Sequence, residues 1–136
     1  MSGLAGPVWV DLMAARKTFR RARRLSGKKA FSRVFGGRCS AADRLLVVFV
    51  MPNGLSYCRL GLTVGRKCGN AVLRNRIKRL LREAFRLGSD ALPQGYDIVC
   101  VPRPGCVSPL EAYQRSIRSL SARAVARYRA SERHEH

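Results

Sequence analysis

Alternating and helical patterns of apolar side chains predict the order helix, strands, helix, strand, helix along the chain. Residues 44–51 form an almost continuous apolar run, and residues 57–64 alternate between apolar and more polar side chains. Both patterns are typical of strands, the second with one buried face. We expect these two strands to pair as antiparallel neighbours across the turn at residues 52–54. Residues 96–101 indicate a further strand, which ends at the prolines that follow.

The predicted first and last helices each have a recognisable start. Ser26 is the expected N-cap of the first helix, which carries Phe31, Val34 and Phe35 on one face and ends at two glycines, residues 36–37. The last helix begins at a capping box over residues 108–111. Its apolar stripe comprises Leu110, Tyr113, Ile117, Leu120, Ala124 and Tyr128.

The middle helix is strongly basic outside its apolar stripe. We expect it to start after an Asn70 N-cap and to end at Gly88. The expected stripe is Leu73, Ile77, Leu80, Leu81 and Ala84. Residues 65–86 contain eight basic residues and one acid, Glu83, which can pair with Arg79 or Arg86. Most of these cations therefore have no acid in the same helix to neutralise them.

The elements predict a single domain in which helices cover a small mixed sheet. A chain of 136 residues suits one domain with a modest core. We assign residues 25–129 to this domain and residues 130–136 to a polar C-terminal tail. Residues 1–24 form a basic N-terminal arm, which we expect to be disordered until it meets a polyanion.

The charge of the chain indicates a polyanionic partner. Its 27 Lys and Arg residues against 8 Asp and Glu give a formal net charge of +19. Nucleic acid is the first candidate, because the release of counterions favours many cationic contacts. An anionic membrane and a disordered basic protein are the alternatives, although a hydrophobic content of 46% argues against disorder. No apolar run approaches the roughly 20 residues of a transmembrane helix.

Residue types that carry out catalysis in proteins are scarce in this chain. Its two histidines, His134 and His136, lie in the C-terminal tail, and its acids are scattered. No phosphate-binding loop or dinucleotide fingerprint occurs, and five cysteines without a C-x-x-C pair favour reduced thiols. We therefore expect no catalytic residue and no metal site here. A helix-turn-helix DNA reader fits poorly, because strands lie on both sides of the basic helix. An RNA-recognition motif fits poorly, because its aromatic RNP motifs are not evident on the strands.

Residues 59–86, RLGLTVGRKCGNAVLRNRIKRLLREAFR, resemble the bacterial ribonuclease P protein component. The resemblance rests on the strand ending in L-G-L-T-V, the two-cation loop, G-N-A-V, and R-N-R followed by I-K-R-L-L-R. It extends more weakly to F-x-x-V-F at residues 31–35 and to the D-I-V-C-V strand with Arg103. It implies an α+β fold, a single-domain αβββαβα sandwich similar to domain 2 of ribosomal protein S5. The crossover through the basic helix would be left-handed, against the usual preference.

The resemblance also implies a function as the protein cofactor of ribonuclease P. The catalytic centre and its magnesium ions would belong to the RNA subunit, and the protein would help to remove the 5′ leader of precursor tRNA. The expected partners are that RNA subunit and precursor tRNA in the cytoplasm, with no membrane and no DNA. A ribosomal protein that binds folded rRNA and a nuclease acting without RNA are the alternatives.

Two sets of residues match the binding positions of the family. The positions that match contacts with the RNA subunit are Arg66, Lys67, Arg74, Asn75, Arg76, Lys78, Arg79 and Arg82. The positions that match the leader cleft are Phe31, Phe35, Val47, Phe49 and Arg103. Arginine forks suit phosphate groups, and aromatic rings accept any base by stacking.

Overall fold

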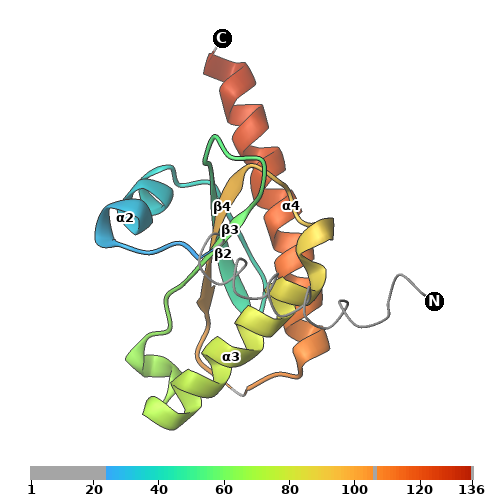
Figure 1. The fold of residues 1–136 in the computed structure, drawn as a ribbon. Coiled ribbons are helices and arrows are strands. Elements are labelled where there is room, and N and C mark those ends of the chain that lie inside the picture. The colour runs from blue at the N-terminus through green and yellow to red at the C-terminus, as the bar shows by residue number, and fades with distance from the viewer. Residues whose placement is uncertain (1–23, 106, 136) are drawn as a thin grey trace, which may run out of the picture.

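The computed structural model describes residues 24–105 and 107–135. The expectations for the N-terminal arm concern residues that lie outside these ranges, apart from Arg24. The elements, drawn in Figure 1, are α2 (Lys28–Gly36), β1 (Ser40–Ala42), β2 (Leu46–Pro52), β3 (Arg59–Leu62), α3 (Ala71–Gly88), β4 (Tyr96–Pro102) and α4 (Leu110–Glu135). Short 3-10 helices, η2 (Arg66–Cys68) and η3 (Ser89–Ala91), flank α3. This order and a mixed sheet confirm the predicted α+β class.

The sheet has the strand order β1-β2-β4-β3. β4 runs antiparallel to β2 and parallel to β3, with Ile98 opposite both Val50 and Leu60. The expected hairpin between residues 44–51 and 57–64 is therefore wrong, because β4 lies between them. Alternation along a strand shows which face is buried, but it does not show which strand lies alongside. The β3–α3–β4 connection is a parallel crossover, and its left-handed sense stays an expectation.

Two further features of the N-terminal half differ from the sequence prediction. The apolar pattern did not predict β1, because three residues are too few to show alternation, although the αβββαβα order implied by the resemblance includes this strand. The expected Ser26 cap is wrong, since α2 starts at Lys28 and its N-cap is Gly27, at a φ of 92°. The preceding Leu25 donates its backbone N–H to the Leu60 carbonyl at 2.8 Å. The chain is thus still held at the sheet edge at residue 25, and Gly27 supplies the turn into the helix.

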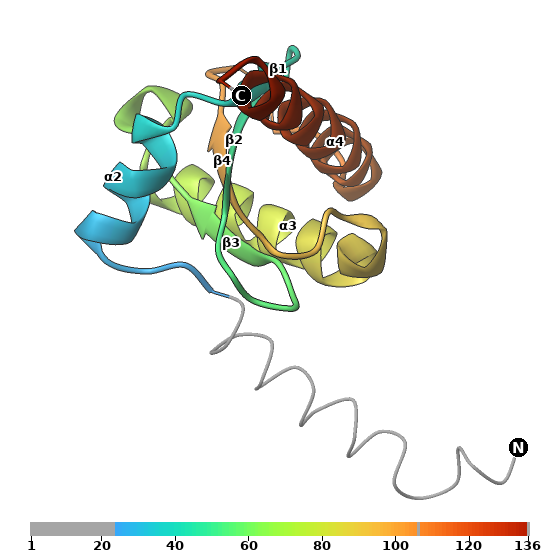
Figure 2. The same cartoon turned by 90° about the horizontal axis from the view of Figure 1, so that it is seen from above.

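Helices cover both faces of the sheet. α2 lies on one side and α4 on the other (Figure 2), and α3 packs beside α4. The larger core joins β2, β3 and β4 to α3 and α4, and its residues include Leu46, Val48, Leu60, Ile77, Leu81, Ile98, Ile117 and Leu120. The smaller core, under α2, consists of Leu25, Val34 and Val99 with partly buried Phe31, Phe35 and Phe49. The predicted helical stripes of α3 and α4 are largely confirmed.

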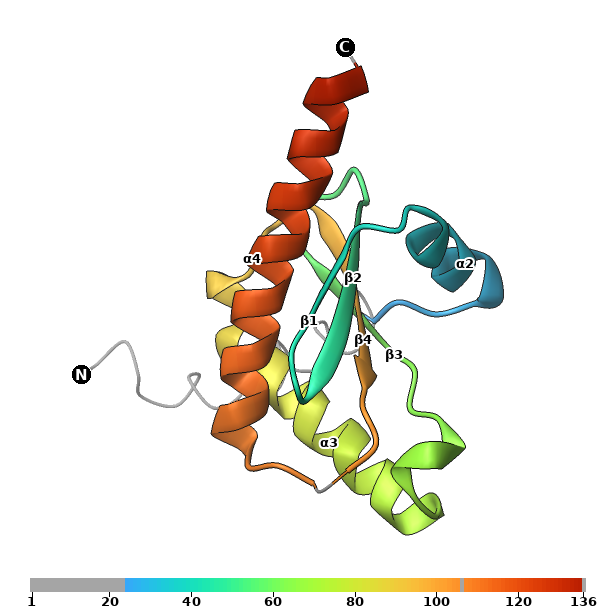
Figure 3. The same ribbon diagram turned by 180° about the vertical axis from the view of Figure 1, so that it is seen from behind.

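The last helix is longer than expected. α4 continues to Glu135, so the segment that we expected to be a polar tail is helical through residue 135. The helix extends beyond the sheet, as Figures 1 and 3 show. The Tyr128 hydroxyl donates to the Glu132 carboxylate at 3.0 Å, and the Tyr128 ring packs edge-on against Tyr96. The Tyr96 contact joins this part of α4 to β4, and the Glu132 contact lies within the helix.

Gly61 allows α2 to approach the sheet. A Cβ atom at this position would lie 2.9 Å from the Phe31 ring and 3.0 Å from the Leu25 side chain. We expect Gly61→Val to lower the free energy of unfolding by about 1–3 kcal/mol, because the added atoms force α2 away from β3. Urea unfolding measures this decrease. Gly65→Ala is the control, since a Cβ there meets nothing within 4 Å; equal decreases in both variants would contradict the proposed close approach.

Candidate nucleic-acid interface

The eight basic and amide side chains expected to contact the RNA subunit come from two consecutive elements. Arg66 and Lys67 are exposed on η2. The remaining six lie on α3, where four are exposed and Arg74 and Lys78 are half-buried. The Asn70 side chain caps α3 as predicted, accepting from the Leu73 N–H at 2.9 Å. A rigid helix therefore presents most of this set on its solvent side.

Two details distinguish individual cations of α3. Arg86 pairs with Glu83, with 3.0 Å between Nε and Oε1, which confirms one of the two predicted pairings. The Nε of Arg74 is buried and has no hydrogen-bond partner among the described residues. A buried donor without an acceptor costs about 1–3 kcal/mol. An acceptor supplied by a ligand would remove that cost.

The aromatic set gathers on the opposite side of the sheet from α4. The rings of Phe35 and Phe49 meet edge-on at 4.9 Å between centroids, and Phe31 lies 6.3 Å from Phe35. All three are partly buried against Val34 and Val99. Val47 precedes Phe49 by two residues in β2 and is half-exposed on the same face of the strand. The three phenylalanines thus form one surface, which is also part of a small core, and Val47 extends the same face of β2.

Arg103 lines a groove at the start of α4 whose lining includes none of these four residues. Its Nη1 donates to the Asp43 carbonyl at 2.8 Å, and Arg44 and Arg115 line the same groove. The Asp43 carboxylate accepts from the Ser116 hydroxyl at 2.7 Å. Burial acts to raise the pKa of Asp43, but this bond, two backbone N–H groups and Arg123 outweigh it and lower the pKa. Sequence spacing could not group these arginines, because they come from three separate segments.

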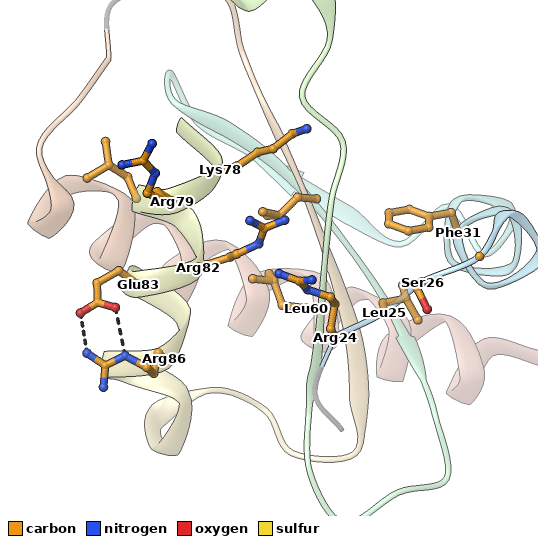
Figure 4. A pocket seen from close by; sticks show the side chains of 13 residues that line it. Arg24, Leu25, Ser26, Phe31, Leu60, Lys78, Arg79, Arg82, Glu83 and Arg86 are labelled. Atoms are coloured by element: carbon orange, nitrogen blue, oxygen red, sulfur yellow. Dashed lines mark hydrogen bonds and ion pairs between the residues drawn. The ribbon is translucent and has the colours of Figure 1, made fainter. Parts of the chain in front are cut away.

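A larger groove, of about 840 Å³, separates α3 from the segment that leads into α2. Lys78, Arg79 and Arg82 line it from α3, and Arg24 and Phe31 line it from the other side. Figure 4 shows Arg24 and Arg82 extending toward the middle of the groove from these two sides. The apolar lining consists of Leu25, Leu60, Leu62 and Leu80 together with Phe31. The structure therefore brings Phe31, expected at the leader cleft, into a groove with cations expected to contact the RNA subunit.

A buried carboxylate fixes the position of α2 relative to the sheet. Asp97 of β4 is fully buried. It accepts from Arg59 Nε at 2.8 Å and Nη2 at 2.9 Å, from Arg33 Nη2 at 3.1 Å and from Asn53 Nδ2 at 3.0 Å. This network links α2, β3, β4 and the β2–β3 loop. It was not predicted, because Arg33, Asn53, Arg59 and Asp97 come from separate segments of the chain.

Metal-binding clusters and membrane-spanning helices are both lacking in residues 24–105 and 107–135. No three His, Cys, Asp or Glu side chains within these ranges form a group that could hold a metal ion. In the same residues, no helix combines the length and apolar character needed to cross a membrane.

Comparisons with known proteins agree with the arrangement of these elements. The family model described as Ribonuclease P matches residues 19–127. The ribonuclease P protein component of Alkaliphilus oremlandii is 43% identical over 84 residues, which cover 62% of this chain and 74% of that protein. That of Caldanaerobacter subterraneus subsp. tengcongensis is 46% identical over 80 residues, covering 59% and 69%.

The solved structures that resemble this chain are also RNase P proteins. The RNase P protein of Staphylococcus aureus superposes with a TM-score of 0.65 at 32% identity, covering 74% of this chain and 93% of that chain. That of Thermotoga maritima gives a TM-score of 0.56 at 41% identity, covering 59% and 73%. The family model spans most of the domain, and both sequence and fold agree with its members. The chain therefore belongs to the ribonuclease P protein component family.

Proposed function

We propose that this protein binds the catalytic RNA of ribonuclease P and the 5′ leader of precursor tRNA, and so promotes endonucleolytic removal of the leader to give mature tRNA 5′ ends. The basic surface of η2 and α3 binds the RNA subunit, and the aromatic surface of α2 and β2 holds the leader. Cleavage takes place in the RNA subunit, in the cytoplasm. The observation that supports this most is the basic face of α3 in a chain of this family.

The basic surface suits a folded RNA for physical reasons. Each arginine contact with a phosphate releases condensed counterions, which favours binding at low salt. Guanidinium groups bind phosphate with two parallel hydrogen bonds. The exposed amide of Asn75 can both donate and accept, as a ribose 2′-hydroxyl requires. Because α3 is capped and packed on the core, little entropy is lost in ordering its backbone on binding.

The aromatic surface suits a strand whose sequence varies between precursors. Every base has a flat face that stacks on an aromatic ring, with a gain of about 1–3 kcal/mol per base. Packing of Phe35 against Phe49 holds both rings in place before a ligand arrives. Their remaining exposed area is then available for stacking with little loss of side-chain entropy.

We assign magnesium mainly to the RNA subunit. Bound magnesium would stabilise the charge on the reacting phosphate and activate the attacking water. Asp97, which is fully buried, and Asp43, which is half-buried, do not fit such a site, because arginines, an asparagine, a serine and backbone N–H groups already engage them. The contribution of this chain is to neutralise phosphates and to position the two RNAs.

Reconstitution tests the proposed function directly. Ribonuclease P RNA with this protein is expected to cleave precursor tRNA at a lower magnesium concentration than the RNA alone, because bound cations replace part of the ionic screening. Protein without RNA should leave the precursor intact. A ribosomal protein would instead give no stimulation and would co-sediment with ribosomal subunits. Absence of stimulation contradicts the proposal.

Replacing Phe35 and Phe49 together with alanine should weaken binding of precursor tRNA to the holoenzyme by about tenfold or more, since base stacking is lost. The measurement compares the affinities for precursor and for mature tRNA, which has no leader. Phe31 is left in place because it also lines the groove beside α3. Assembly with the RNA subunit and the melting temperature serve as controls. Equal weakening for precursor and mature tRNA would argue against a leader surface at these rings.

A further inference from the structure

The groove between α3 and the segment before α2 joins cations of the basic surface and Phe31 of the aromatic set to four leucines that neither proposed surface uses. We propose that it binds one unpaired nucleotide of the RNA subunit, with the base against the leucine floor and the flanking phosphates on Arg24, Lys78 and Arg82. This inference rests on the proposed function, because it names the part of the RNA subunit that the α3 side of the protein would hold.

The floor of the groove fits a flat apolar group. Leu25 and Leu60 are almost fully buried beneath it, while Leu62 and Leu80 are partly exposed. The Phe31 ring closes the side nearest α2, where it rests on Gly61. Sites for small ligands are typically of this kind, mostly apolar with a few polar groups at defined positions, and occupy about 300–1,000 Å³. A nucleobase matches such a floor, because its faces are apolar and its edges are polar.

The charges around the groove select an anionic occupant. Five cations line it, namely Arg24, Lys78, Arg79, Arg82 and Arg86. The only acid among the lining residues is Glu83, which is paired with Arg86. A basic peptide, including the arginine-rich segment that precedes Arg24, would place like charges together and is disfavoured there. The negative phosphates on both sides of a nucleotide complement the positive charges of these cations at the edge of the groove.

The apolar floor of the groove favours an unpaired nucleotide over a duplex. In a double helix the base faces are stacked on one another, so only phosphates, riboses and base edges reach a protein. An unstacked nucleotide can place its base on the leucines while its phosphates stay at the rim. The α3 side of the groove belongs to the surface that we assign to the RNA subunit, and this points to that RNA as the source of the nucleotide.

Matched substitutions test the floor and the rim separately. Leu80→Gln is expected to weaken assembly with the RNA subunit by about tenfold, because a polar side chain no longer supports the base. Leu87→Gln, an exposed position on the same helix outside the groove, should leave it unchanged. Arg24→Ala should weaken assembly. It should also lower the slope of the logarithm of affinity against the logarithm of salt concentration by about one. Arg118→Ala, exposed on α4, is the charge-matched control. If Leu80→Gln does not fold, Leu62→Thr replaces it.

Photocrosslinking identifies the occupant. The RNA subunit carrying 4-thiouridine, or 6-thioguanosine in a parallel sample, is irradiated in complex with the protein, and the linked peptides are mapped. A link from an unpaired nucleotide of the RNA subunit to the peptide around Leu25 or Leu62, absent in Leu80→Gln, supports the inference. A link from precursor tRNA instead, or wild-type affinity for both Leu80→Gln and Arg24→Ala, overturns it. Arg74→Ala with Arg76→Ala distinguishes failure of the groove inference from failure of the proposed function. If that pair also leaves assembly with the RNA subunit intact, the proposed function itself fails.

Discussion

Replacing Arg74 and Arg76 together with alanine is expected to weaken assembly with the ribonuclease P RNA by about 100-fold. A hydrogen bond to a charged group contributes about 1.5–3 kcal/mol, and each 1.4 kcal/mol corresponds to a tenfold change in affinity. The dependence of the logarithm of affinity on the logarithm of salt concentration should also flatten, by about one for each phosphate that the variant no longer binds. Affinities measured at several salt concentrations give both quantities.

Arg74 should account for much of this effect. Its Nε is buried and unsatisfied within the described chain, so an acceptor from the RNA gains more there than at an exposed site. Arg115→Ala with Arg118→Ala removes the same charge from exposed positions on α4 and serves as the control. If both pairs change affinity and salt slope equally, the RNA responds to net charge alone, and a specific docking surface on α3 is ruled out.

Replacing Asp97 with asparagine is expected to lower the free energy of unfolding by about 3 kcal/mol, because breaking a buried ion pair leaves its partner without compensation. The carboxylate is fully buried and receives four hydrogen bonds from three side chains. An asparagine of similar size keeps the packing but removes the charge that Arg33 and Arg59 require. Urea unfolding measures the decrease, and the slope against denaturant should stay constant if the transition remains two-state.

The arginine partners of Asp97 should differ in their effects. The Arg33 side chain is 47% exposed, so Arg33→Ala is expected to cost less than about 1 kcal/mol. Arg59, with two hydrogen bonds to Asp97 and a side chain 28% exposed, should cost more when replaced by alanine. Because Asp97 ties α2 to the sheet, its replacement should also weaken leader binding. Wild-type stability of Asp97→Asn would show that the network does not hold the fold together.

The helices were largely predictable because a helical stripe depends on neighbours three and four residues apart. Ile77, Leu81 and Ala84 are buried as predicted, and Asn70 caps α3. The resemblance to the ribonuclease P protein component, which rests on a contiguous stretch around R-N-R, is confirmed by the family match. In each case the information lies within a short length of chain.

Strand pairing was less predictable because it depends on residues far apart in sequence. β4 inserts between β2 and β3, although the whole of α3 separates it from β3 along the chain, so the nearest strand in sequence is not the partner of β2. The start of α2 was misplaced for a related reason. Leu25 is held by a hydrogen bond to Leu60 on another strand, and no local pattern shows that contact.

The sequence by itself determined the excess of positive charge, the faces of the helices and the family. Only the tertiary structure decided which surfaces adjoin one another. It brings Phe31 beside the cations of α3 in one groove, places Arg103 with Arg44 and Arg115, and buries Asp97 between Arg33 and Arg59. The physical reason is that periodicity and charge are properties of neighbouring residues. The distance between separate segments is set instead by how the sheet orders its strands and how the helices pack on it.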